Sequence, residues 1–251
     1  MDDIRFGNPE LIGSSYSTMK TIGIVGGIAW PSTLVYYKEI HEYFKTQSGS
    51  DSLHTPKLVL AQTDFALIEK AQAEGHWDEV GRLLTVEANK LKAAGADFFL
   101  LACNTVHTAD DFIINNVDLP LVHIVDAAAE TVIGMGCKIV GLLGSRYTMR
   151  GTYFVGRLKA KYGLQVLVAE GDHEENVHHA LYNELAKNIF VEKTRLKFQA
   201  AIDDLIARGA EAIILGCTEF GILVKEQHSS VPIIDTSIVH ARAAVDFALE
   251  V

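Results

Sequence analysis

Short apolar, β-branched runs alternate along the chain with longer segments in which apolar residues recur at helical spacing. The runs predict strands at residues 21–25, 57–62, 98–102, 121–124, 138–143, 165–168, 212–215 and 232–234. The longer segments predict helices at residues 32–46, 77–94, 178–185, 191–208 and 240–249. Gly95 and Gly209 each close a long predicted helix, where a positive φ is expected. This alternation is typical of an α/β fold with mostly parallel sheets.

The pattern is duplicated. Residues 20–26 resemble residues 137–144, and the segment that starts at Gly95 resembles the one that starts at Gly209. In each copy a cysteine, Cys103 or Cys217, lies eight residues after the glycine, and a proline-led apolar run follows. The duplication predicts two similar lobes related by pseudo-two-fold symmetry, with the active site between them.

The repeats also suggest how the chain is divided. Residues 1–18 lack periodicity and are expected to form an N-terminal extension. The first lobe is predicted to comprise residues 19–124 plus 234–251, and the second lobe residues 125–233.

Each of the two cysteines follows a predicted strand, so each is expected at the carboxyl end of a parallel sheet, where open α/β folds bind ligands. Racemisation needs a base on one face of the α-carbon and an acid on the other. A thiolate can serve as the base and a thiol as the acid. Cys103 and Cys217 are therefore the predicted catalytic residues.

Polar residues beside the cysteines could stabilise charge that develops on a substrate carboxylate. Asn104, Thr105 and Thr218 adjoin the two cysteines. Glu219 is either a helix first-turn residue or a group that positions the second thiol, and both interpretations stay open. An early glycine-rich loop offers the further binding candidates Gly27, Ser32 and Thr33.

These motifs, in duplicated order over residues 19–250, resemble the aspartate/glutamate racemase family, and most of all its aspartate racemases and a broader-specificity branch. The resemblance implies racemisation without pyridoxal phosphate, a two-lobed fold and a homodimer. It also implies a lysine that binds the side-chain carboxylate of the substrate. Counting back from Cys217 gives Lys187 as this lysine, whereas the local segment 181–185 gives Ala186.

Composition excludes several other classes. The net charge is −10 and no basic run marks a nucleic-acid groove. The longest apolar stretches are too short to span a membrane, the first residues lack a secretory signal, and three cysteines fit a reducing compartment, so a cytoplasmic protein is expected. Metal-ligand spacing and a complete nucleotide-binding fingerprint are absent, so neither a metal nor another cofactor is predicted.

The predicted function is racemisation of a small acidic amino acid, L-aspartate to D-aspartate, by Cys103 and Cys217. Glutamate or several amino acids are alternative substrates, since aspartate and glutamate differ by one methylene. A decarboxylase or a cis–trans isomerase of the same superfamily is a second alternative. A binding protein without catalysis, which would need no thiols, is a third.

Overall fold

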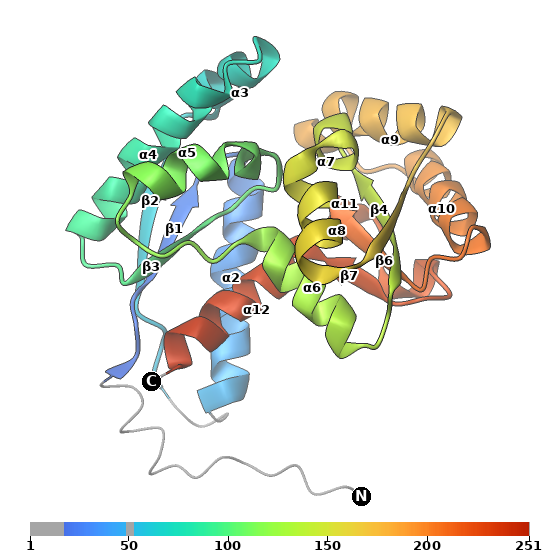
Figure 1. Cartoon of the computed structure of the whole chain (residues 1–251). Coiled ribbons are helices and arrows are strands. Elements are labelled where there is room, and N and C mark those ends of the chain that lie inside the picture. The colour runs from blue at the N-terminus through green and yellow to red at the C-terminus, as the bar shows by residue number, and fades with distance from the viewer. Residues whose placement is uncertain (1–17, 49–52, 251) are drawn as a thin grey trace, which may run out of the picture. The chain divides into compact units, whose positions relative to one another are not determined.

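The computed structural model describes residues 18–48 and 53–250, which form two compact units (Figure 1). Unit 1 combines Met1–Ala102, Phe112–Val122 and Ala241–Val251, and unit 2 combines Cys103–Asp111 and His123–His240. Residues 1–17 of the predicted N-terminal extension lie outside the described residues. The lobe boundaries expected from the repeats stay a prediction.

Unit 1 contains a parallel sheet with strand order β2-β1-β3. Its strands are β1 (Ile22–Gly26), β2 (Leu58–Gln62) and β3 (Phe98–Leu101). Its helices are α2 (Trp30–Ser48), α3 (Phe65–Ala73) and α4 (Trp77–Ala93), and α5 (Asp110–Asn116) and α12 (Thr236–Leu249) each run from unit 2 into unit 1. Apolar side chains of β1 and β3 form one core with Ala241, Ala244, Val245 and Ala248 of α12.

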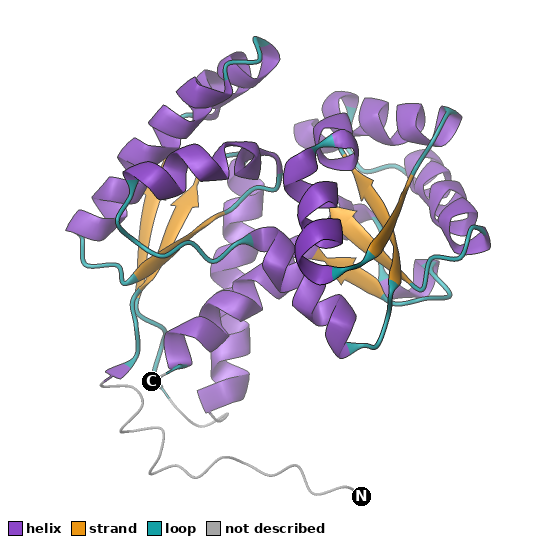
Figure 2. Ribbon diagram, viewed as in Figure 1, coloured by secondary structure: helices purple, strands orange, loops and turns teal. Residues whose placement is uncertain are grey.

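Unit 2 contains a parallel sheet with strand order β5-β4-β6-β7, enclosed by helices (Figure 2). Its strands are β4 (Ile139–Gly144), β5 (Gln165–Val168), β6 (Ala212–Gly216) and β7 (Ile233–Asp235). Its α-helices are α6 (Ile124–Gly134), α7 (Arg146–Arg150), α8 (Arg157–Tyr162), α9 (Asp172–Asn183), α10 (Glu192–Ala207) and α11 (Phe220–Leu223). Shorter turns are η1 (Thr105–Ala109), η2 (Thr152–Gly156), η3 (Leu185–Lys187) and η4 (Glu226–His228).

Equivalent residues of the two repeats make the same backbone hydrogen bonds. Phe99 N donates to Pro120 O and Ile213 N donates to Pro232 O, both at 2.9 Å. Gly95 and Gly209 end their helices with φ of 89° and 101°, as their positions predicted. The α/β fold class with parallel sheets is therefore confirmed, and the duplicated motifs form the same local structure in both units.

The predicted strand at residues 121–124 is wrong. Only Leu121 pairs, in an isolated parallel bridge to Phe99, and α6 begins at Ile124. The reason is a helix cap, because the His123 Nδ1 accepts a hydrogen bond from the Val125 N–H at 3.1 Å and so starts the helix where the apolar run predicted a strand. The equivalent run in the second repeat does form the strand β7.

Candidate active site

Both candidate thiols belong to unit 2 and follow strand ends. Cys217 comes directly after β6, and Cys103 lies two residues after β3, where the chain enters unit 2. Each residue is partly exposed and carries a free thiol. The two sulfurs are close enough that a charge on Cys103 raises the pKa of Cys217.

Cys217 donates a hydrogen bond to a neighbouring carboxylate. Its Sγ lies 2.9 Å from Glu219 Oε2, which also accepts from the Thr218 hydroxyl at 3.0 Å. Burial raises the pKa of the Cys217 thiol well above its ordinary value, and the adjacent Glu219 charge raises it further. Of the two roles left open for Glu219, this contact is the one expected of a group that positions the second thiol. These surroundings favour the protonated form of the Cys217 thiol.

Cys103 has different surroundings. Burial raises its pKa to about 11, while hydrogen bonds from the backbone N–H groups of Val106 and Thr105 oppose that rise. These donors come from the first turn of η1, which begins at Thr105. The Glu219 charge raises the pKa of Cys103 as well, but Cys103 receives two backbone N–H donors and Cys217 one, and Cys217 also hydrogen-bonds the Glu219 carboxylate. These differences favour loss of the proton from Cys103 before Cys217.

Asn104 is fixed by a buried hydrogen-bond chain. Its Nδ2 donates to Thr236 Oγ1 at 3.0 Å, and the Thr236 hydroxyl donates in turn to Leu215 O at 2.8 Å. Since the Thr236 proton goes to Leu215, the amide must present its NH₂ to Thr236 and its Oδ1 elsewhere. Among the described residues that buried Oδ1 has no hydrogen-bond donor. It is therefore a buried acceptor on the residue that follows Cys103.

A buried histidine lies under the Cys103 loop. His107 Nδ1 is 2.9 Å from Cys103 O, and its ring packs edge-on against His123 at 4.6 Å between centroids. Burial lowers the pKa of His107 well below its ordinary value, and the neighbouring histidines add to this effect. A neutral imidazole in this position donates to the loop carbonyl and helps to fix Cys103.

The sequence pattern did not single out Tyr153, Thr148 or Thr236. The Tyr153 and Thr148 hydroxyls lie 2.9 Å apart, at the carboxyl end of β4. Thr148 comes from a Ser145-capped turn after β4, the repeat counterpart of the Gly27 loop after β1. Comparing the hydroxyl residues of these two loops is the signal that could have found Thr148.

The first-loop candidates form a tight turn in unit 1. Gly27 has φ of 81°, and a Cβ there would lie 2.4 Å from Gln62 Cγ, so only glycine fits. Its N–H donates to Thr33 Oγ1 at 2.9 Å, which ties the loop to α2. Ser32 is buried in the same first turn of α2. The structure gives Gly27 and Thr33 a role in shaping this loop.

Lys187 lies exposed at the end of the short turn η3. Asn188 follows it with φ of 60°, the left-handed conformation that ends the turn. Its assignment to a substrate carboxylate stays a prediction that rests on the resemblance.

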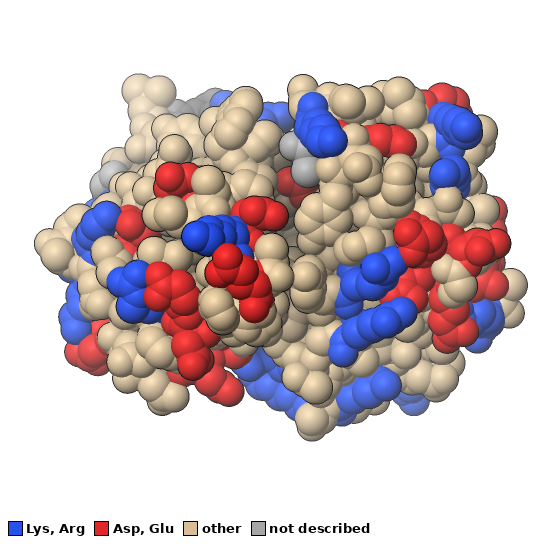
Figure 3. All heavy atoms as spheres, turned by 90° about the horizontal axis from the view of Figure 1, so that it is seen from above, with Lys and Arg blue, Asp and Glu red and all other residues tan. Residues whose placement is uncertain are grey.

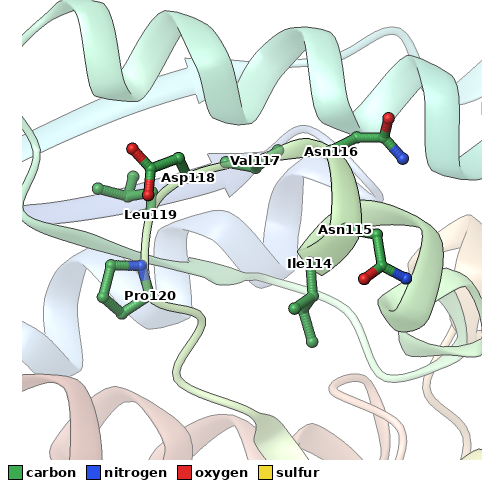
Figure 4. Close-up of a pocket in the computed structure, with 7 residues that line it drawn as sticks. All are labelled: Ile114, Asn115, Asn116, Val117, Asp118, Leu119 and Pro120. Carbon is green, nitrogen blue, oxygen red and sulfur yellow. The ribbon is translucent and has the colours of Figure 1, made fainter.

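The described surface carries a hollow in unit 1 that contains neither candidate thiol. This hollow has a volume of about 690 Å³ and is lined by the single segment 114–120 (Figure 4). Its polar side chains are two asparagine amides and the Asp118 carboxylate, and it contains no cysteine or histidine. On the face drawn in Figure 3, acidic and basic side chains are interspersed. Within the described ranges, His, Cys, Asp and Glu form no group of three that could hold a metal ion. No helix in those ranges is long and apolar enough to cross a bilayer.

A profile of the Asp/Glu/hydantoin racemase family matches residues 25–244, most of the chain. The protein belongs to this family. The chain is 41% identical to a candidate Asp/Glu racemase from Yersinia pestis, covering 92% of this chain and all of that one, with a TM-score of 0.87. An aspartate racemase homologue from Pyrococcus horikoshii is 30% identical, with a TM-score of 0.79 and coverage of 92% and 100%.

A further relative is named as a racemase of broad specificity. The broad specificity amino-acid racemase RacX of Bacillus subtilis is 25% identical over 225 residues, which are 89% of this chain and 96% of that protein. The resemblance seen in the duplicated motifs is thus confirmed at the level of the family.

Proposed function

We propose that the protein racemises an acidic amino acid, aspartate in the first place, with Cys103 and Cys217 as the two proton-transfer groups. The observation that carries the proposal is the asymmetric thiol pair. Cys103 receives two backbone N–H donors, whereas Cys217 receives one and donates its own proton to the Glu219 carboxylate. One base and one acid are the two groups that racemisation requires.

In the proposed reaction the Cys103 thiolate removes the α-proton of one enantiomer and becomes a thiol. The electron pair of the C–H bond passes into the α-carboxylate as an enediolate. The Cys217 thiol then gives its proton to the opposite face and becomes the thiolate. The reverse reaction exchanges the two roles, so no other reactant is consumed.

Neighbouring groups would bind the substrate. The buried Asn104 Oδ1, an acceptor, suits the α-ammonium group. Thr105 and Thr218 are kept as candidates for the α-carboxylate, where charge stabilisation is the largest demand of the reaction. To donate there, the Thr218 hydroxyl would exchange its hydrogen bond to Glu219 for one to the substrate. We keep Gly27, Ser32, Thr33 and Lys187 as further candidates for substrate binding.

Aspartate is favoured because the Pyrococcus protein, covered over its whole length, is named an aspartate racemase homologue. The Bacillus relative makes a broad-specificity racemase the second candidate. We further propose a cytoplasmic homodimer, as the family resemblance implies, and sedimentation equilibrium would measure the dimer.

The test is to incubate the protein with L-aspartate and then with a panel of L-amino acids, and to follow optical rotation. We expect rotation to decay to zero with aspartate fastest, together with uptake of one solvent deuterium at the α-carbon. Release of carbon dioxide, or conversion of maleate to fumarate, would instead indicate a decarboxylase or an isomerase. Aspartate binding without turnover would indicate a binding protein.

A further inference from the structure

Tyr153 lies where both thiols influence its hydroxyl. It belongs to the π-turn η2, which packs against η1, the turn that follows Cys103. A charge on Cys103 or on Cys217 raises the pKa of Tyr153, in addition to the larger rise caused by burial. By position, Tyr153 lies between the turn that follows Cys103 and Thr148, which packs beside Gly216, the residue before Cys217, although nothing in the sequence motifs pointed to it.

Two threonines hold the phenol in place. Thr148 Oγ1 lies 2.9 Å from the Tyr153 hydroxyl, and Thr105 forms a second side-chain hydrogen bond to it. Both interactions lower the pKa of Tyr153 and oppose the rise caused by burial, and either oxygen of the Thr148–Tyr153 pair can be the donor. In the orientation in which both threonines donate to the phenol oxygen, the phenol keeps its own proton for another acceptor.

Glycines make room for this arrangement at the sheet ends. A Cβ on Gly144 or Gly216, the last residues of β4 and β6, would come within 2.9 Å of Thr148 side-chain carbons. A Cβ on Gly151 would lie 2.9 Å from the Tyr153 ring. Thr148 thus packs beside Gly216, the residue that precedes Cys217, and the Tyr153 ring packs against the backbone at Gly151.

We propose that the Tyr153 hydroxyl is a further functional group of the site, an inference that rests on the proposed racemisation. It acts as a neutral hydrogen-bond donor to the negative charge that proton transfer moves between Cys103 and Cys217. In the proposed reaction that charge passes from one sulfur to the enediolate and then to the other sulfur. A donor near both sulfurs lowers the energy of each of these states. A phenol that remains protonated is suited to this role.

The test measures thiol reactivity as well as racemisation. In the full chain carrying Cys137→Ser, iodoacetamide alkylation of Cys103 and Cys217 is followed by peptide mass spectrometry from pH 7 to pH 10. We expect Tyr153→Phe to slow alkylation of both thiols by about tenfold at pH 8, as a rise of one pKa unit would. Racemisation should fall about 10- to 100-fold.

Tyr162→Phe is the matched control, because Tyr162 lies on α8 beside Lys161. In this variant Cys103 and Cys217 should be alkylated at the parental rate. If Tyr153→Phe does not fold, Thr148→Val, which keeps the side-chain shape, is the second variant. We expect it to slow alkylation of both thiols by a smaller factor. Parental alkylation rates in Tyr153→Phe, or slowing of only one thiol, would overturn the proposal. Failure of the proposed function would show separately, as absence of racemisation by the parent protein.

Discussion

The two candidate thiols differ in the groups that surround each sulfur, and the difference predicts how each variant should behave. Removing one sulfur removes the proton transfer on one face of the substrate. Cys103→Ala and Cys217→Ala should therefore each abolish racemisation while the fold is retained, since neither change deletes a large core side chain. Circular dichroism for the fold and optical rotation for turnover check this. Near-parental racemisation by either variant would contradict the two-thiol mechanism.

Serine variants separate the two faces. In Cys103→Ser or Cys217→Ser the remaining thiolate can still remove and return a proton on its own face. We expect exchange of the α-proton for deuterium without inversion, in one enantiomer for one variant and in the other enantiomer for the other. NMR of each enantiomer in heavy water measures this. The same enantiomer preference in both variants would show that the thiols do not face opposite sides.

The Glu219 carboxylate should control the reactivity of Cys217 more than that of Cys103. Burial and the Glu219 charge together raise the pKa of Cys217, whereas Glu219 is a smaller cause at Cys103. Glu219→Gln should therefore lower the pKa of Cys217 and speed its alkylation at pH 8 by up to about tenfold. A larger change at Cys103 than at Cys217 would contradict the assigned contact.

At the scale of elements, α6 and α8 are joined by a partly buried ionic network. Asp126 on α6 accepts hydrogen bonds from Arg157 at 2.6 Å and from Lys161 at 2.9 Å on α8. Burial alone would raise the pKa of Asp126, but these partners lower it below its ordinary range. Asp126→Asn should reduce the free energy of unfolding at pH 7 by about 1–3 kcal/mol.

The pH dependence of this effect has a definite sign. Because folding lowers the pKa of Asp126, its contribution is fully present above the unfolded value of about 4 and is lost as pH falls toward the folded value. Urea unfolding should show the variant and the parent beginning to converge below about pH 4 and converging further as the pH falls. Asp118→Asn, which removes an exposed pair with Lys92, is the control and should change stability little at any pH.

At the scale of the whole molecule, the activity should increase with pH. The pKa of Cys103 is raised to about 11, so the thiolate fraction rises about tenfold for each pH unit below that value. We expect log kcat/KM for aspartate to rise with a slope near 1 between pH 6 and pH 8.5. A plateau or a maximum near pH 7 would show that the active thiolate forms at lower pH.

The intact protein should also work without added groups. The proposed reaction uses only thiols and hydrogen-bond donors of this chain. Racemisation should therefore persist after dialysis, with chelator and with hydroxylamine, and purified protein should show no visible absorbance. Loss of activity with chelator that added metal restores would contradict this expectation.

By itself the sequence determined the α/β class, the repeated order of strands and helices, and the position of the two candidate cysteines after strand ends. It could do so because hydrophobic period and glycine-terminated helices are local properties. Local pattern also misassigned residues 121–124, where a His123 cap outweighed an apolar run. Only the tertiary structure brought Tyr153 and Thr148 together, ordered Asn104 through Thr236, and gave Cys217 its contact with Glu219. The contact between Asn104 and Thr236 joins residues far apart in the chain, whereas the other two contacts join near neighbours whose side chains meet because of the turn that follows each strand. Burial and neighbouring charges, which no periodicity encodes, then set the pKa of each thiol.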